Sequence, residues 1–489
     1  MFRRIGAGHG DNLSAYWMTL VRAADGRMVL GTALGVGLAV RAAVFWHTPD
    51  LGTEIVDEQH YAALASNVLA GHGFAWGPGQ PTSIRPPLYP GLLAGIWSVA
   101  GAGNLQAVRL VQIVLALLTT GLVYQLGRRL FSPAVGRYAA AATFLYPSLI
   151  FFNFTILTET LYVFLLTGFI LLAVVLIDRG RPATALACGL TLGLSCLTRS
   201  VLWPLPVVLC PLLLFLLPGP RHTRLALSAL VFAGYALAVG PWAVRNTQVQ
   251  GVVTIVDTMG GLNLHMGNYE HTPDDRLWDA ISLTGEKHWA YPLQAEHSGG
   301  GLTEGQKDRW AQQRALSYIA AHPGTSLRRS AIKFADFWGI ERELAGGFSQ
   351  GIYQPPTWFA VTAAAAVALA FVLVALTGTA GLWLVGAREW RAHVLVLLPA
   401  VAIMAGHTIT FGHSRYHLPL IPILALYGAA FGRDVLARSV PLAQPAVLRY
   451  GKLRLAASVT CVLGLLLIWS RQLLLVDSER ISAFFANVR

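Results

Sequence analysis

The sequence is poor in charge. Only 12% of its 489 residues are Asp, Glu, Lys or Arg, and 55% are hydrophobic. Soluble domains carry about 25% charged residues, so this composition predicts a protein whose solvent is largely lipid. The net charge of +12 comes from arginines spread in small groups between apolar runs, whereas a nucleic-acid binder gathers them on one face. We therefore expect a polytopic membrane protein and no nucleic-acid partner.

The chain also lacks the patterns of several enzyme classes. Its four cysteines lie in apolar runs and form no CxxC pair, so neither a disulfide framework nor a cysteine-based zinc site is indicated: Cys188, Cys196, Cys210 and Cys461. No P-loop, dinucleotide-binding glycine pattern, HExxH or GxSxG motif occurs. Nothing in the sequence is typical of a nucleotide-dependent enzyme.

Apolar runs long enough to cross a bilayer are abundant. A span needs about 20 residues, and roughly eleven runs approach that length. They lie near residues 28–47, 106–127, 137–153, 155–177, 183–198, 200–218, 225–243, 355–386, 392–411, 415–432 and 455–475. The expected fold is an all-α bundle of these transmembrane helices. The first run follows a basic segment and has no cleavage site, so we expect it to be retained.

Basic residues mark one set of the short loops. This set holds Arg128, Arg129, Arg137, Arg179, Arg181, Arg221, Arg224, Arg388, Arg391, Arg433, Arg438, Arg449, Lys452 and Arg454, whereas the opposite loops carry mainly single arginines. Because cytoplasmic loops are enriched in Lys and Arg, we expect the first set in the cytoplasm, the N-terminus inside and the C-terminus outside.

Two segments on the outer side are not spans. In the first, residues 48–105, a helix is expected over 57–70, and an apolar helix over 88–100 is too short to cross and is expected to lie in the interface. In the second, residues 245–352, Thr303 is typical of a capping box, and a basic amphipathic helix follows. The expected division is 1–244, 245–352 and 353–489.

Ionisable groups at the apolar boundary are the candidate functional residues. Asp57 opens the first outer helix beside Glu58, and Tyr61 lies one turn further on the same face. Helix capping also explains acids in a first helical turn, and this alternative stays open. Glu159 lies about a turn inside the fourth apolar run. The alternative explanation of Glu159 is a structural carboxylate that accepts hydrogen bonds from helix amides and threonine hydroxyls.

Four arginines fall near the outer boundary: Arg85, Arg199, Arg245 and Arg415. Each alone is explained as an interfacial anchor. Together, opposite two acids, they predict an anionic headgroup such as a phosphate bound between helices. His413 and His417 have metal-ligand spacing but no third ligand in sequence, so we predict no metal site.

Several stretches together resemble the GT-C glycosyltransferases, in the branch of the protein O-mannosyltransferases, lipid A aminoarabinose transferases and rhizobial core-sugar transferases. They are Asp57-Glu-Gln-His-Tyr61, Arg85-Pro-Pro-Leu-Tyr-Pro90, Leu157-Thr-Glu159, Pro241-Trp-Ala-Val-Arg-Asn246, Gly260-Gly-Leu-Asn-Leu-His-Met-Gly-Asn268 and Ser414-Arg-Tyr-His-Leu-Pro419. The likeness runs from about residue 28 to residue 432. The likeness rests on the order of these stretches and on their placement along the chain.

The resemblance implies a GT-C bundle whose active site is roofed by amphipathic helices of the first outer loop, beneath a larger mixed outer loop. It carries the catalytic acid onto Asp57, a second acid onto Glu159 and the phosphate-facing base onto Arg85. The other candidate substrate-binding residues are Glu58, Tyr61, Arg199, Arg245, Arg415 and Tyr416.

The implied activity is inverting transfer of a sugar from a polyprenyl-phosphate donor. The acceptor would be a hydroxyl of a lipid, glycan or protein on the periplasmic face of a bacterial inner membrane, among membrane lipids. No cofactor is expected, although metal-dependent oligosaccharyltransferases of the superfamily leave a divalent cation open. The alternative function is a polytopic transporter or flippase of a lipid-linked or anionic substrate. It is disfavoured because we find no inverted repeat or paired broken helices.

The arginine asymmetry gives a direct test of orientation. A reporter fused after Gly79 or Gly300 should be active outside the cytoplasm, and one after Gly219 inside it. Alkaline phosphatase and green fluorescent protein fusions would measure this. A cytoplasmic signal from the Gly79 fusion would place Asp57 on the wrong face for a lipid-linked donor.

Overall fold

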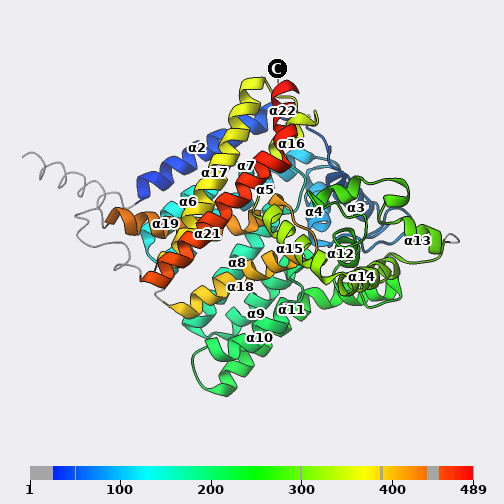
Figure 1. Cartoon of the computed structure of the whole chain (residues 1–489). Coiled ribbons are helices and arrows are strands. Elements are labelled where there is room, and N and C mark those ends of the chain that lie inside the picture. Colours follow the sequence, from blue (N-terminus) through cyan, green and yellow to red (C-terminus); the bar gives the residue numbers. More distant parts are fainter. Residues whose placement is uncertain (1–25, 50, 298–299, 386–388, 438–450, 488–489) are drawn as a thin grey trace, which may run out of the picture.

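The structure is a computed structural model that describes residues 26–49, 51–297, 300–385, 389–437 and 451–487. Within these ranges the chain is helical and forms no β-strand; Ala75 and Pro81 make an isolated bridge. The all-α prediction is therefore confirmed for the described part. Arg388, Arg438 and Arg449 of the basic loop set lie outside it. Figure 1 shows long helices packed side by side, with shorter helices gathered at one end.

Eight segments of the described chain are long and apolar enough to cross a membrane. They are α2 (Arg27–His47), α5 (Leu105–Leu130), α8 (Glu159–Arg179), α11 (Arg221–Gln250), α17 (Thr357–Leu384), α18 (Trp390–Ile409), Ser414–Val435 and Lys452–Val476. The seventh joins a 3₁₀ segment, Ser414–Leu420, to α19 (Ile421–Ala437), and the eighth contains α21 (Lys452–Arg471). The protein is thus a multi-pass membrane protein.

The other three predicted spans are shorter helices. The third run forms α6 (Pro133–Leu145) and α7 (Pro147–Phe151), and the fifth and sixth runs form α9 (Pro182–Cys196) and α10 (Leu205–Leu216). The break between α6 and α7 has a local cause, because Pro147 disfavours helical backbone at Tyr146, which is extended with φ −64° and ψ 118°. The count of roughly eleven spans stays a prediction.

Helix α8 lies at the centre of the bundle. In its most apolar stretch 72% of the residues are buried inside the protein, against 17% for α2 and for α21. It packs against α5, α9 and α18, while α2 lies at the edge (Figure 1). The first residue of this central helix is Glu159. A carboxylate is therefore fixed at the end of the best-buried element.

The ends of the described chain lie at opposite ends of the bundle. A Cβ at Gly26, just before α2, would lie 3.2 Å from Arg137 Cβ, so this end of the described chain lies beside the first turns of α6. The last helix, α22 (Ser478–Asn487), packs near α16 (Glu343–Ser349) among the outer helices. This arrangement agrees with an odd number of crossings, and which end faces the cytoplasm remains a prediction.

Two short helices from the first outer segment and several from the second gather at one end of the bundle (Figure 1). The first segment forms α3 (Val56–Leu69) and α4 (Leu88–Ala100), close to the predicted bounds. Helix α3 ends where Gly71 and Gly73 take positive φ of 78° and 76°, which glycine adopts without a side-chain clash. The second segment forms α12 (Gly260–Met266), α13 (Tyr291–Glu296), α14 (Glu304–Ala321), α15 (Pro323–Phe337) and α16, with 3₁₀ turns at Leu277–Ser282 and Gly285–Lys287.

The capping box at Thr303 is confirmed. Its hydroxyl accepts from the Gln306 backbone N–H, and the Gln306 side chain accepts from the Thr303 N–H. The basic amphipathic helix that follows, α15, buries two of its three basic residues, while Arg328 is exposed. Arg329 is 3% exposed and Lys333 is fully buried, whereas Leu327 is 75% exposed. Both cations donate to backbone carbonyls of neighbouring segments, so hydrogen bonds offset their burial.

Glycines allow α9 and α11 to approach closely. A Cβ at Gly189 would lie 1.9 Å from the Val231 carbonyl oxygen, and one at Gly234 would lie 2.3 Å from the Leu186 oxygen. Small residues at such crossings let two backbones touch, which is how helices associate in lipid.

We expect Gly189→Ala to destabilise the bundle by about 1–3 kcal/mol, because the added methyl meets backbone that cannot move aside. Gly240→Ala on α11 is the matched control, since nothing lies within 4 Å of its Cβ position. Thermal unfolding of the purified protein in detergent measures the difference. Equal unfolding temperatures for the two variants would contradict the close packing.

Candidate active site

Five ionisable side chains from five segments meet at the end of the bundle where the short helices gather. Arg85 Nη2 donates to Asp57 Oδ1 at 2.5 Å, and Arg415 Nη1 lies 3.6 Å from Asp57 Oδ2. Arg199 Nη1 donates to Glu159 Oε1 at 2.7 Å, and Arg415 Nε donates to the same oxygen. Arg415 therefore joins the two acids into one cluster, which we call the arginine–carboxylate cluster.

The cluster is rich in cations. Its ion pairs join three guanidiniums to two carboxylates, and the carboxyl group of Asp257 lies close enough to Arg85 to interact with its charge. Glu159 is fully buried, and its Oε2 has no hydrogen-bond partner in the described part of the chain. A buried carboxylate is stable only where cations compensate its lost hydration, and two arginines do so here. An anion that entered would find guanidiniums already oriented.

Asp57 is a half-buried carboxylate under strong positive influence. Burial acts to raise its pKa, but the nearby Arg85, Arg415 and Arg199 guanidiniums, with a smaller effect from His60, outweigh this and hold the pKa below its ordinary value. Asp57 is therefore ionised at neutral pH. It is also a weak base for as long as the arginines remain paired with it.

Aromatic rings support the guanidiniums. Arg85 lies over the Tyr61 ring at 5.6 Å, which confirms that Asp57 and Tyr61 face the same cation. Arg199 lies over the Tyr416 ring at 5.4 Å. Ring faces attract cations and restrict their movement. Tyr61, Arg199 and Tyr416 are thus brought to the cluster as the sequence predicted.

Glu58 has its hydrogen-bond partners away from the cluster, and its role in substrate binding stays a prediction. Its Oε2 accepts from the backbone N–H groups of Glu54 and Ile55 at 2.9 and 3.0 Å, and its Oε1 accepts from the Ile156 N–H at 2.8 Å. The carboxylate caps α3 and ties it to the segment that precedes Glu159. The capping explanation considered for Asp57 therefore applies to its neighbour.

Arg245 is also used differently from the prediction. Its Nη1 donates to the Thr82 carbonyl and the Ser83 hydroxyl at 2.5 and 3.2 Å, and its Nη2 donates to the Phe74 carbonyl at 2.8 Å. It shares no described ion pair with either acid of the cluster. We therefore interpret Arg245 as a clamp on the first outer segment, which leads directly to Arg85.

The second outer segment reinforces this clamp. Glu304 at the start of α14 accepts from the Thr82 hydroxyl at 2.6 Å and from the Ser83 N–H at 2.7 Å. Because Arg85 follows Ser83 by two residues, these contacts hold the backbone next to Arg85 in place.

Asp257 is a site residue that the sequence did not reveal. It follows α11, accepts from the Met259 N–H at 3.2 Å and from the Ser200 hydroxyl, and lies close enough to Arg85 to interact with its charge. Burial raises the pKa of this carboxyl. Its sequence signal was only a single acid in an apolar stretch of the outer loop, which solvation explains equally well.

The two histidines with metal-ligand spacing bind different carboxylates. His413 Nδ1 lies 3.1 Å from Glu343 Oε1, and His417 Nε2 lies 3.0 Å from Glu341 Oε1. They lie in or beside a 3₁₀ segment, so i, i+4 neighbours do not share a face as they would on an α-helix. Among the described residues no three His, Cys, Asp or Glu side chains gather as metal ligands would.

Residues 84–244 match the model of the family described as dolichyl-phosphate-mannose-protein mannosyltransferase. This stretch begins just before Arg85 and contains Glu159 and Arg199. No curated protein matches the chain.

Among solved structures, the chain is similar to the archaeal oligosaccharyltransferase AglB from Archaeoglobus fulgidus in complex with an inhibitory peptide and a dolichol-phosphate. The identity is 15% and the TM-score 0.49, over 96% of this chain and 56% of that one. It is also similar to ArnT from Cupriavidus metallidurans bound to undecaprenyl phosphate, with 17% identity and a TM-score of 0.38, over 82% and 78% of the two chains. This chain thus spans just over half the length of the oligosaccharyltransferase. Both likenesses are distant.

Replacing Arg245 with alanine should lower the unfolding free energy more than replacing Arg85. Arg245→Ala leaves the Thr82 and Phe74 carbonyls without their donor, so we expect a loss of about 1–3 kcal/mol in unfolding free energy. Arg85→Ala should cost less, because Arg415 still faces Asp57. Thermal unfolding and limited proteolysis of the first outer segment measure this. If both variants unfold at the wild-type temperature, Arg245 is no clamp.

Proposed function

We propose that this chain is a membrane glycosyltransferase of the GT-C superfamily, which moves a sugar from a polyprenyl-phosphate donor to an acceptor hydroxyl with inversion at the anomeric carbon. The arginine–carboxylate cluster is the observation that carries this proposal. The description of the matching family names dolichyl phosphate mannose, which is a sugar joined to a polyprenyl phosphate.

The three oriented guanidiniums of the cluster fit a phosphate. Arg85, Arg199 and Arg415 present guanidinium forks, which bind two phosphate oxygens at once with good geometry. A carboxylate-rich site would instead attract cations. Because the cluster lies at the end of a lipid-embedded bundle, a donor whose tail stays in the bilayer can reach it with its phosphate.

The chemistry needs one base and no general acid. The bond between the anomeric carbon and the phosphate oxygen breaks, and its electron pair leaves with the phosphate. A new bond forms from the acceptor oxygen to the opposite face of that carbon, and the acceptor proton passes to a carboxylate. The phosphate leaves as a stable anion, so it needs no proton, unlike the leaving group of a glycosidase. The arginines stabilise the charge that grows on it.

Asp57 is the proposed base. In the structure its carboxylate is paired with Arg85 and faces Arg415, which lowers its pKa and its basicity. A donor phosphate would compete for the same two guanidiniums. Their charge would then be shared, so the pKa of Asp57 would rise when the donor is in place. This makes acceptor activation depend on donor binding.

Glu159 has the role of a positioning residue in this proposal. It is fully buried and holds Arg199 and Arg415 through one oxygen, so it sets the distance between the two cations. The outer helices of residues 245–352 would cover the site and select the acceptor. We place the reaction on the periplasmic face of a bacterial inner membrane, and a lipid, glycan or protein acceptor fits this chemistry.

Donor consumption separates transfer from transport. Purified protein in vesicles with a labelled polyprenyl-phosphate sugar and a membrane extract as acceptor should release free polyprenyl phosphate and label the acceptor. Movement of intact donor across the vesicle membrane without its cleavage would favour the transporter alternative.

We expect Asp57→Asn to lower the turnover number by at least about 100-fold, because a positioned base contributes about 10²–10⁴-fold. Donor binding should be unchanged or tighter, since the amide competes less for Arg85. Release of polyprenyl phosphate and equilibrium binding of the donor measure the two effects separately.

Glu54→Gln is the matched control for this variant. It removes an exposed carboxylate three residues away and should leave turnover close to the wild type. Wild-type turnover in Asp57→Asn, with normal expression, would refute the base assignment.

A further inference from the structure

The polar side of α15 is turned into the protein. Arg329, Lys333 and Asp336 of this helix are all buried. Lys333 Nζ donates to the Asn268 side chain at 2.9 Å, and Arg329 donates to two backbone carbonyls of the same outer segment. These charged groups therefore find their partners within the protein instead of in the surrounding solvent.

The opposite side of α15 is an exposed apolar stripe. Leu327, Ala331 and Phe334 are spaced i, i+4 and i+7, so they lie on one face of the helix. All three are exposed, and Leu327 is 75% exposed. We call these three residues the α15 stripe. A helix on a water-covered surface shows the reverse arrangement, with its apolar residues inward and its charges outward. Water is therefore a poor solvent for this face.

Helix α15 lies against the ends of two membrane-spanning segments (Figure 1). Lys333 Nζ donates to the carbonyl of Ile409, the last residue of α18, at 2.9 Å. Where α15 ends, Trp469 Nε1 in the last turn of α21 donates to the Trp338 carbonyl at 2.9 Å. The helix is therefore held at the level at which α18 and α21 end.

Both spanning segments expose apolar side chains beside these contacts. Ile409 is 56% exposed, and Leu474 and Leu475, near the end of the span Lys452–Val476, are 73% and 77% exposed. Lipid is the solvent around membrane-spanning segments, so lipid covers these side chains. Helix α15 has 15 residues, which is too short to cross the bilayer. Its stripe extends the lipid-facing surface onto a helix that does not span.

We propose that the α15 stripe is a membrane-contact surface, with Leu327, Ala331 and Phe334 among the acyl chains just below the lipid headgroups. An amphipathic helix binds at this depth by burying its apolar face. Because the polar face of α15 is fixed to the protein, lipid contact anchors the second outer segment to the membrane. The proposal concerns lipid contact alone and is independent of sugar transfer.

This anchor reaches the segment that carries Arg415. A Cβ at Gly412 would lie 2.2 Å from the Lys333 carbonyl oxygen, and Arg415 follows Gly412 by three residues. Helix α15 therefore links the membrane surface to the backbone beside the arginine–carboxylate cluster.

Spin-label accessibility in lipid nanodiscs tests the contact at single residues. Single cysteines replace Leu327, Ala331 or Phe334 in a chain whose four native cysteines are changed to alanine, and each carries a nitroxide. Val401→Cys, at an exposed position of α18, is the control for lipid, and Gln313→Cys, at an exposed position of α14, is the control for water. Molecular oxygen collides more often with labels in lipid, and a water-soluble nickel complex collides more often with labels in water.

We expect the three stripe positions to behave like Val401→Cys, with frequent oxygen collisions and few nickel collisions, and Gln313→Cys to show the reverse. Nickel collisions as frequent at residue 327 as at residue 313 would overturn the proposal, because the face would then lie in water. Few collisions with either reagent at residue 327 would also overturn it, because a protein partner such as a second copy of this chain would then cover the face.

A second measurement uses the unaltered protein, so it does not depend on the folding of the cysteine-free chain. Wild-type protein is illuminated in nanodiscs that contain a phosphatidylcholine with a diazirine in its acyl chain, and the labelled peptides are identified by mass spectrometry. We expect label on α15 and α18 and none on α14. An unlabelled α15 beside a labelled α18 would overturn the proposal.

Discussion

The ion pairing of Arg415 with two acids is the interaction on which the rest of the site depends. Its guanidinium donates to Glu159 on the central helix and faces Asp57 on the first outer helix. Charges taken from water must be compensated locally, so this pairing forces α8, α3 and the segment before α19 to meet at one end of the bundle. The three guanidiniums that this network orients are the groups to which the proposed donor phosphate would bind.

Buried cations also fix the outer helices relative to the bundle. Lys333 in α15 donates to the Asn268 side chain and to the Ile409 carbonyl at the end of α18, both at 2.9 Å. Burial lowers the pKa of Lys333 to about 7. A Cβ at Gly412 would lie 2.2 Å from the Lys333 carbonyl oxygen, so α15 is in direct contact with the segment that leads to Arg415. Helix α15 and the segment that carries Arg415 are therefore held in place by the same contacts.

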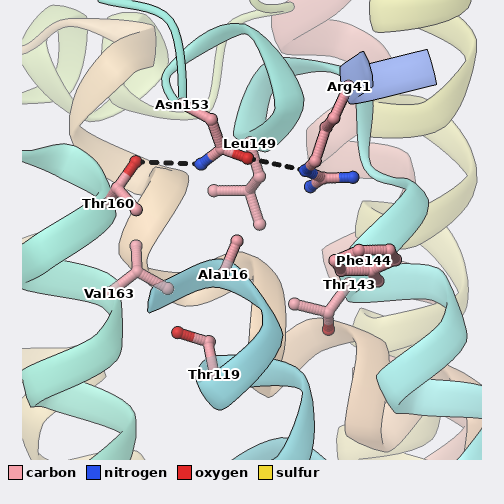
Figure 2. A pocket seen from close by; sticks show the side chains of 9 residues that line it. All are labelled: Arg41, Ala116, Thr119, Thr143, Phe144, Leu149, Asn153, Thr160 and Val163. Atoms are coloured by element: carbon pink, nitrogen blue, oxygen red, sulfur yellow. Dashed lines mark hydrogen bonds between the residues drawn. The ribbon is translucent and has the colours of Figure 1, made fainter. Parts of the chain in front are cut away.

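In the arginine–carboxylate cluster an incoming anion would have to compete with Asp57 and Glu159 for the guanidiniums, which suits a ligand that binds and leaves. The start of α8 is also held from the side of α2. Asn153 accepts from Arg41 of α2 and donates to the hydroxyl of Thr160, the residue after Glu159 (Figure 2).

The sequence by itself determined the membrane class, the outer helices α3, α4 and α14, and the main members of the site. These follow from local rules: apolar length, positive-φ glycines and the capping box, and the cost of an acid such as Glu159 at the edge of an apolar run. Tertiary structure decided which polar group binds which partner. Asp57 and Glu58 are adjacent acids in one helical turn, yet one faces arginines and the other accepts from the backbone of Ile156, because their side chains leave the helix about 100° apart. Arg245 and Arg85 likewise look alike in sequence, and only the fold of the first outer segment directs one to carbonyls and the other to Asp57.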